Sequence, residues 1–236
     1  MIYNQFNNTN KKRKIAVLID PDKHTENSVL STLNICKECG VDFILVGGSL
    51  VSKPIDEFII SLKKICDIPV ILFPGSLLQI SKHADAILLL SLISGRNAEF
   101  LIGNHVLAAP ILKRSNLEII STGYMLIENG KTTSVEYMSN TRPIPSDKTD
   151  IAVATAIAGE MLGLKSIYLE AGSGAIKLVP SEMISAIKQN TSIPLIVGGG
   201  IRSREHLDAI FNAGADIAVI GNSLENVPER LKEMLG

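Results

Sequence analysis

Eight short apolar runs recur along this chain of 236 residues, and this rhythm limits the possible folds more than any other feature. Each run is rich in β-forming residues and is bounded by Gly, Pro, Asp or Ser, which is typical of strands. Most of them lack the alternation of a half-exposed strand, which indicates parallel strands buried on both faces. The predicted strands cover residues 14–20, 42–47, 69–74, 86–90, 117–122, 166–170, 193–197 and 217–221.

Amphipathic segments lie between these runs. The predicted helices cover residues 26–39, 53–66, 98–106, 150–163, 180–189, 203–213 and 224–234. Eight strands that alternate with helices predict an α/β fold, a (β/α)8 or TIM barrel, which typically takes about 250 residues. We therefore expect one domain over residues 1–236, in which residues 1–12 form a polar N-terminal extension.

Two spacings depart from the regular rhythm. The third and fourth strands end at Pro74 and Leu90, only 16 residues apart, so the third helix is expected to be shortened or replaced. A long segment separates the fifth and sixth strands. Within it, residues 124–138 carry Asn129-Gly130, a pair that favours a tight hairpin turn. We expect a hairpin there that covers a substrate at the mouth of the barrel.

Composition excludes several classes of protein. The chain has 23 Lys and Arg against 24 Asp and Glu, a balance that argues against a nucleic-acid partner. No apolar run approaches the ~20 residues of a membrane span, and no signal peptide is visible, so we expect a cytoplasmic protein. Cys36 and Cys39 form one CxxC without a second pair and are interpreted as packing residues.

The ends of the first two strands carry candidate metal or phosphate ligands, because chemistry in this fold sits at the carboxyl ends of the strands. Asp20 and Asp22 supply two carboxylates that suit Mg²⁺, although Asp-Pro-Asp also starts a loop and caps a helix. Gly47-Gly48-Ser49 permits close backbone approach to an anion, and a tight turn explains the glycines equally well.

The last three strands end in a second group of candidates. Glu170 closes a buried strand, where desolvation suits it to act as a base; a rim ion pair is the alternative. Gly172-Ser173-Gly174 follows it and offers backbone N–H groups. The triplet 198–200 and Gly221-Asn222 end the next two strands, and loops after strands seven and eight commonly bind phosphate. The pattern predicts a phosphate site at these loops.

Taken together, the strand ends resemble the geranylgeranylglyceryl phosphate synthase family, which includes the bacterial heptaprenylglyceryl phosphate synthases. The segments that carry the resemblance are IDPDK, LVGGSLV, FPGS, STGYMLIENG, YLEAGSGA, VGGGIRS and GN. They extend from about Lys14 to the C-terminus. The resemblance implies a modified TIM barrel with an abnormal third helix, and a Mg²⁺-dependent transfer of a prenyl group from a prenyl diphosphate to the C3 hydroxyl of sn-glycerol 1-phosphate.

The resemblance also implies roles for individual residues. It places Mg²⁺ and the diphosphate at Asp20 and Ser49, the general base at Glu170, and Tyr124 near the prenyl trough and the reacting centre. The residues that it assigns to glycerol phosphate are Tyr168, Leu169, Glu170, Ala171, Gly172, Ser173, Gly174, Gly199, Gly200, Gly221 and Asn222. It further suggests a homo-oligomer, and its lipid substrates imply peripheral contact with a membrane.

One position that departs from the pattern of the heptaprenyl branch bears on the identity of the prenyl donor. The heptaprenyl branch carries a Lys two residues before the strand-one Asp, and this chain has Leu18 there. That difference favours geranylgeranyl diphosphate, with a longer donor such as heptaprenyl diphosphate as the alternative. Other TIM-barrel enzymes that bind phosphosugars or flavin remain rival interpretations, as does a non-catalytic protein that binds phosphate or prenyl lipid.

Overall fold

Eight parallel strands close into a barrel in which each strand pairs with its neighbours in chain order. The computed structural model describes residues 1–7, 13–225 and 227–236. Strand β1 pairs with β8, which closes the ring. The predicted barrel is therefore confirmed, and the strands are β1 (Lys14–Ile19), β2 (Phe43–Val46), β3 (Val70–Leu72), β4 (Ala86–Leu92), β5 (Glu118–Leu126), β6 (Ser166–Glu170), β7 (Leu195–Gly198) and β8 (Ile217–Ile220).

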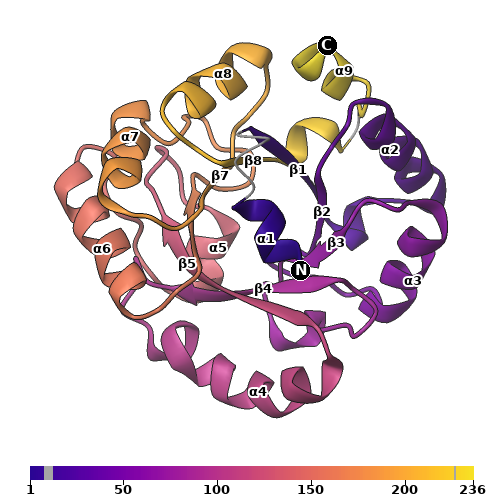
Figure 1. Ribbon diagram of the computed structural model, residues 1–236, viewed down its shortest axis with the longest axis horizontal. Helices are drawn as coiled ribbons and strands as arrows, with labels where there is room; N and C mark the ends of the chain where they lie inside the picture. Colours follow the sequence, from indigo (N-terminus) through magenta and orange to yellow (C-terminus); the bar gives the residue numbers. More distant parts are fainter. Residues whose placement is uncertain (8–12, 226) are drawn as a thin grey trace.

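Most of the helices surround the barrel, while α1 lies over its middle in the view of Figure 1. The α-helices are α1 (Ile2–Phe6), α2 (Glu26–Glu38), α3 (Ile55–Ile65), α4 (Asn104–Ser115), α5 (Ser134–Ser139), α6 (Thr149–Met161), α7 (Ser181–Asn190), α8 (Arg204–Asn212) and α9 (Arg230–Leu235). Short turns of other helix types are η1 (Pro21–Lys23), η2 (Leu77–Gln79), η3 (Glu99–Gly103) and η4 (Asn222–Leu224).

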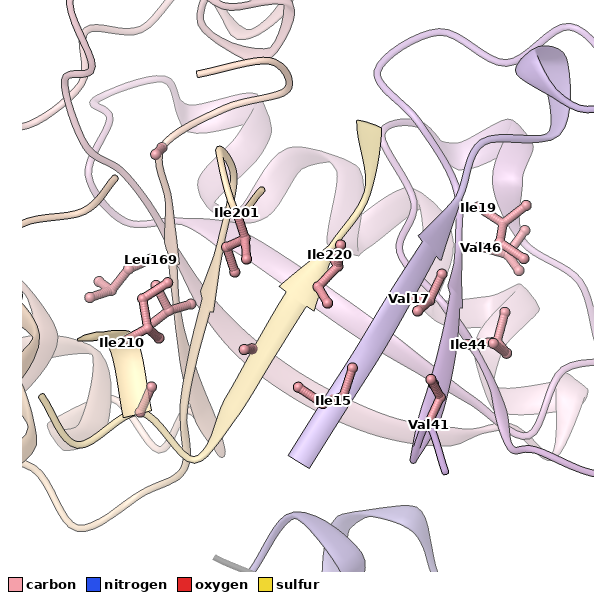
Figure 2. Packing of buried hydrophobic residues seen from close by; sticks show 14 of the residues in the cluster. Ile15, Val17, Ile19, Val41, Ile44, Val46, Leu169, Ile201, Ile210 and Ile220 are labelled. Carbon is pink, nitrogen blue, oxygen red and sulfur yellow. The ribbon is translucent and has the colours of Figure 1, made fainter. Parts of the chain in front are cut away.

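The strands divide their side chains between two apolar layers, because successive residues of a strand point to opposite faces. On β1, Ile15, Val17 and Ile19 belong to the layer beneath the helices, together with Ile44 and Val46 of β2 (Figure 2). The intervening positions fill the barrel interior. This alternation decides which residues at the strand ends face the inside of the barrel.

The described segment between β3 and β4 contains no α-helix, so the third strand of the barrel lacks the helix that normally follows it, as the spacing predicts. One 3-10 turn, η2, occupies the connection between β3 and β4. Its Gln79 side chain is buried and stabilises the connection: Nε2 donates to the Gly48 carbonyl at 2.8 Å, and Oε1 accepts from the Gly48 and Gly75 N–H groups at 3.1 and 3.2 Å. A single amide thus joins the ends of β2 and β3 where a helix is absent.

The predicted hairpin over residues 124–138 is wrong. Strand β5 continues to Leu126, Ile127 pairs in parallel with Ile144, and the chain then forms α5. The physical reason is a capping box: Thr133 accepts from the Glu136 N–H at 3.2 Å, while the Glu136 carboxylate accepts from the Thr133 N–H. This signal outweighs the turn preference of Asn129-Gly130.

Three further helical segments differ from what the sequence predicted. Residues 2–6 of the polar N-terminal extension form α1, whose Phe6 ring packs edge-on against Phe43 at 5.1 Å, while residues 8–12 lie outside the described part. The helix predicted over 98–106 begins as the π-helical η3 and continues as α4 to Ser115. The last helix starts at Arg230 rather than at residue 224, because η4 precedes it.

Candidate active site

A cavity of about 850 Å³ opens at the carboxyl end of the barrel. Its volume lies within the range of about 300–1,000 Å³ that is usual for ligand sites. The end of nearly every strand contributes to its wall, as expected for this fold. Most of its wall is apolar, whereas the charged and glycine-rich residues gather at the ends of β1, β2, β6, β7 and β8.

A buried carboxylate lies at the centre of this cavity. Glu170 ends β6 and is only 7% exposed. Its Oε2 accepts from the Tyr124 hydroxyl at 3.2 Å and its Oε1 accepts from the Gly172 N–H at 2.6 Å. Burial raises the pKa of Glu170 above the ordinary value, although these donors and the Tyr168 hydroxyl act in the opposite direction. A carboxylate in such surroundings suits the task of accepting a proton.

Three aromatic rings form a wall beside this carboxylate. Phe73 stacks on Tyr168 with ring centroids 5.1 Å apart, and Tyr124 lies 5.3 Å from Tyr168 and 5.8 Å from Phe73. Burial raises the pKa of both tyrosines well above the usual value, so both remain protonated and donate hydrogen bonds. The rings hold Glu170 at the border between the polar and apolar parts of the cavity.

The predicted phosphate loops meet on one side of Glu170. The Ser173 hydroxyl donates to Asn222 Oδ1 at 2.6 Å, which brings the loops after β6 and β8 together. Gly199, after β7, has a φ of +86°, and a Cβ atom there would lie 2.6 Å from both Glu170 Oε1 and the Gly172 nitrogen. Only glycine fits this position. The three loops therefore form a cradle of small residues open to an anion.

Asp20 and Ser49 line the same cavity at the ends of β1 and β2, and β1 pairs with β8, the strand that ends at the cradle. A Cβ atom on Gly48 would lie 2.9 Å from Asp20 Oδ2, so the glycine lets the two loops approach. Asp20 Oδ1 accepts the Asp22 N–H at 3.1 Å. Desolvation raises the pKa of Asp20 despite this bond and the nearby Lys23 ammonium. A partly buried carboxylate of this kind gains from a bound cation.

These donors fit Mg²⁺. The cation prefers carboxylate and hydroxyl oxygens, and it commonly takes one or two carboxylates while waters and substrate phosphates fill the other positions. Within the described residues, no group of three or more His, Cys, Asp or Glu side chains is arranged as a metal site. One carboxylate and one hydroxyl, at Asp20 and Ser49, leave the other positions around the cation to waters and to the phosphate of a ligand.

Comparison with known proteins defines the family. The model of the PcrB family matches residues 7–235. The geranylgeranylglyceryl phosphate synthase of Chitinophaga pinensis is 52% identical over 236 residues, which covers 99% of this chain and 94% of that protein. The chain belongs to the PcrB/geranylgeranylglyceryl phosphate synthase family.

Solved members of the family share the whole fold. The (S)-3-O-geranylgeranylglyceryl phosphate synthase of Thermoplasma acidophilum, solved with its substrate sn-glycerol-1-phosphate, superposes with a TM-score of 0.93 at 34% identity, covering 100% of this chain and 97% of that one. A relative known here by its sequence, the Pyrococcus furiosus synthase, is 44% identical over 218 residues, covering 92% and 86% of the two chains. A tryptophan synthase α-subunit from the same organism is 14% identical with a TM-score of 0.59, which shows the barrel fold alone.

Most of the residues that the family resemblance singles out line the cavity. These are Asp20, Ser49, Tyr124, Tyr168, Glu170, Gly172, Ser173, Gly174, Gly199, Gly200, Gly221 and Asn222. Leu169 and Ala171, which the resemblance also assigns to glycerol phosphate, do not line it. Their side chains belong to the layer beneath the helices, because they alternate with Tyr168 and Glu170 along one extended segment.

Sequence reasoning missed other residues of this cavity. Lys23 and Glu225 form an ion pair at its polar rim, although 202 positions separate them. The apolar end, between η2 and α4, includes Leu77, Ile80 and Phe100. Leu18 lines the cavity beside Gly221, where a Cβ atom would be 3.6 Å away. Of these residues, only Leu18 was singled out in the sequence, because the heptaprenyl branch of the family carries a Lys at that position.

Proposed function

We propose that this protein is a prenyltransferase that joins the geranylgeranyl group of geranylgeranyl diphosphate to the C3 hydroxyl of sn-glycerol 1-phosphate and releases diphosphate. The observation that carries the proposal is the layout of one cavity. A glycine-rich anion cradle, a buried carboxylate and an apolar channel follow one another within it. The names of its relatives, which match over nearly the whole chain, agree with this reaction.

Different residues of the cavity carry out different parts of the proposed reaction. The loops that contain Gly172, Ser173 and Gly199 bind the acceptor phosphate, which positions the C3 hydroxyl near Glu170. The hydroxyl oxygen bonds to the first carbon of the prenyl chain as the bond from that carbon to the diphosphate oxygen breaks. The hydroxyl proton passes to the Glu170 carboxylate, whose orientation Tyr124 and the Gly172 N–H fix. The apolar space between η2 and α4 receives the tail.

Asp20 and Ser49 hold Mg²⁺ in this proposal. The cation supplies charge neutralisation, which makes the diphosphate a better leaving group. We expect Asp20→Asn to weaken the apparent Mg²⁺ affinity about 100-fold, because even outer-shell changes cost about 10–100-fold. The activity of each variant is measured across a Mg²⁺ titration after treatment with a chelator. Asp67→Asn, an exposed site away from the cavity, is the control. An unchanged Mg²⁺ response in Asp20→Asn would contradict this metal site.

The reaction is tested directly by incubation of the purified protein with Mg²⁺, sn-glycerol 1-phosphate and prenyl diphosphates of graded length. Mass spectrometry of the extracted lipid is expected to show the 20-carbon ether product in greatest yield. A heptaprenyl product in greatest yield would replace the donor while preserving the reaction. Absence of product with every donor, from a folded protein, would refute the prenyltransferase assignment.

The surroundings of the enzyme follow from its substrates. We propose a cytoplasmic homo-oligomer that touches a membrane at its periphery and takes no nucleic acid. Support for lipid contact comes from α4 and the turn before it, where Ile102, Val106, Leu107 and Ile111 are each at least half exposed. In the described part of the chain, no helix has the length and apolar character of a membrane span.

A further inference from the structure

Lys23 occupies a position that the proposed reaction does not yet use. It lies at the end of η1, three residues after Asp20. Its Nζ is 2.8 Å from Glu225 Oε1 and 3.7 Å from Asp20 Oδ2, and all three side chains line the polar rim of the cavity. Any anion that binds a cation held by Asp20 therefore comes within reach of this ammonium group.

The backbone that carries Lys23 is fixed by its neighbours. The Asp22 carboxylate accepts from the Ser52 N–H at 2.7 Å and from the Lys53 N–H at 3.0 Å. The Lys53 ammonium in turn donates to the Pro21 and His24 carbonyls, at 2.7 Å each. These bonds join the loops after β1 and β2. The Lys23 side chain itself is 40% exposed, so it reorients without disturbing that framework.

Lys23 is a cation of this cavity that lies within ion-pair range of Asp20, since its Nζ is 3.7 Å from Asp20 Oδ2. Among the described residues, the Asp, Glu, Lys and Arg side chains that line the cavity are Asp20, Lys23, Glu170, Arg202, Glu225 and Arg230. Arg202 is engaged elsewhere, since it donates to the Ala175 carbonyl at 2.9 Å. A diphosphate that approaches Asp20 meets two carboxylates at this rim, Asp20 itself and Glu225. Its charge is offset there by the bound Mg²⁺ and by Lys23.

The contact between Lys23 and Glu225 suits an exchange of partners. The pair is partly exposed, because the Lys23 side chain is 40% and the Glu225 side chain 19% exposed, and an ion pair near the surface contributes only about 0–1 kcal/mol, so breaking it costs little. Oxygens of a diphosphate carry more charge and accept shorter, stronger bonds from an ammonium group than a solvated carboxylate does. The pair therefore holds the ammonium at the rim while no diphosphate is bound, and releases it when one arrives.

We propose that Lys23 binds the diphosphate of the prenyl donor, and that its ammonium group pairs with Glu225 between turnovers, while no diphosphate is bound. This inference rests on the proposed function, since it assigns the anion near Asp20 to the donor. On release of the diphosphate, the ammonium returns to Glu225, which limits product inhibition by diphosphate. Lys23 acts here as a binding residue and takes no part in proton transfer.

Binding of inorganic pyrophosphate in the presence of Mg²⁺ tests the assignment without turnover. Titration calorimetry on Lys23→Met is expected to show pyrophosphate affinity about 10- to 100-fold weaker than in the unmodified protein, as for the loss of one charge-assisted bond. The affinity for sn-glycerol 1-phosphate should stay the same. Lys63→Met is the control, because Lys63 forms a comparable exposed ion pair with Asp85 at the other end of the barrel. Thermal unfolding verifies that each variant is folded.

Removal of the holding group gives the second test. Glu225→Gln keeps the shape of the side chain and frees Lys23, so pyrophosphate affinity is expected to rise about 2- to 5-fold, as for an exposed ion pair. A fall in affinity would overturn the proposed pairing between turnovers and show that Glu225 itself helps to hold the metal ion.

The remaining outcomes separate this inference from the function on which it rests. Unchanged pyrophosphate affinity in Lys23→Met overturns the role of Lys23, even where the unmodified protein forms the prenyl product. Weaker binding of sn-glycerol 1-phosphate in Lys23→Met, with pyrophosphate unaffected, moves Lys23 to the acceptor and also overturns it. Absence of product with every donor, alongside Lys23-dependent pyrophosphate binding, refutes the proposed function and leaves an anion site without a donor.

Discussion

Glu170→Gln is expected to lower kcat about 100- to 10,000-fold, the contribution usual for a positioned general base. Glutamine keeps the size of the side chain and an oxygen that accepts from the Gly172 N–H or the Tyr124 hydroxyl, but it cannot take the proton of the acceptor. Affinity for sn-glycerol 1-phosphate should change little, because the loops that hold the phosphate are untouched. Steady-state kinetics and calorimetry on the same preparation measure both quantities.

The matched control is Glu182→Gln on the exposed surface of α7, which should behave as the unmodified protein. If Glu170→Gln lost acceptor affinity to the same degree as turnover, Glu170 would be a binding residue. Full activity in that variant would exclude it as the base.

The pH dependence follows from the burial of the same carboxylate. Burial raises the pKa of Glu170, so kcat/KM should fall on the acid side as pH drops through that raised value, because a protonated carboxyl group accepts no proton. The residual rate of Glu170→Gln should lack this acid limb. The free energy of unfolding depends on pH in the opposite direction to the activity. The folded state binds this proton more tightly than the unfolded chain does, so the contribution of Glu170 is largest at low pH and is lost as pH rises.

Ser173→Glu is expected to weaken binding of sn-glycerol 1-phosphate about 10- to 100-fold, because like charges brought together at a binding site cost several kcal/mol. Ser173 is exposed and donates to Asn222 at the centre of the glycine-rich loops. A carboxylate there lies beside the acceptor phosphate. Because Ser173 is exposed, the fold should tolerate the change, and calorimetry on the folded variant measures the affinity directly.

Ser173→Gln separates charge from size. It adds nearly the same volume without the charge, so its affinity should remain close to that of the unmodified protein. The difference between the two variants should shrink as salt concentration rises, because ions screen exposed charges. Equal losses in both variants would attribute the effect to crowding, and no loss in either would place the acceptor phosphate elsewhere.

The barrel was predictable because its strands are buried on both faces. Runs such as residues 15–19 and 86–90 are apolar throughout, which few other folds require. The ends of the strands then place Asp20, Ser49 and Glu170 at one edge without any knowledge of distances. The spacing of 16 positions from Pro74 to Leu90 likewise leaves no room for a helix that packs against the barrel.

What the sequence did not reveal depends on contacts between distant segments. The amide of Gln79 joins two strand ends, and no local pattern marks a glutamine for that role. The Lys23–Glu225 pair becomes visible only when the barrel closes. The helix α5 is different, since Thr133 and Glu136 form a capping box that is a local sequence signal, and the hairpin prediction at Asn129-Gly130 overlooked it. Leu169 and Ala171 lie within the segment that the family resemblance assigns to glycerol phosphate, yet their side chains face outward, which strand alternation alone would have indicated.

The replacement of a helix by η2 matters for the donor in the proposed reaction, which joins a charged diphosphate to a long hydrocarbon. The apolar residues between η2 and α4 line the same cavity as the charged residues at the strand ends. Each half of the donor therefore meets a wall of its own polarity. The hydrocarbon gains from leaving water, while the phosphate oxygens stay among polar groups, where burial costs least.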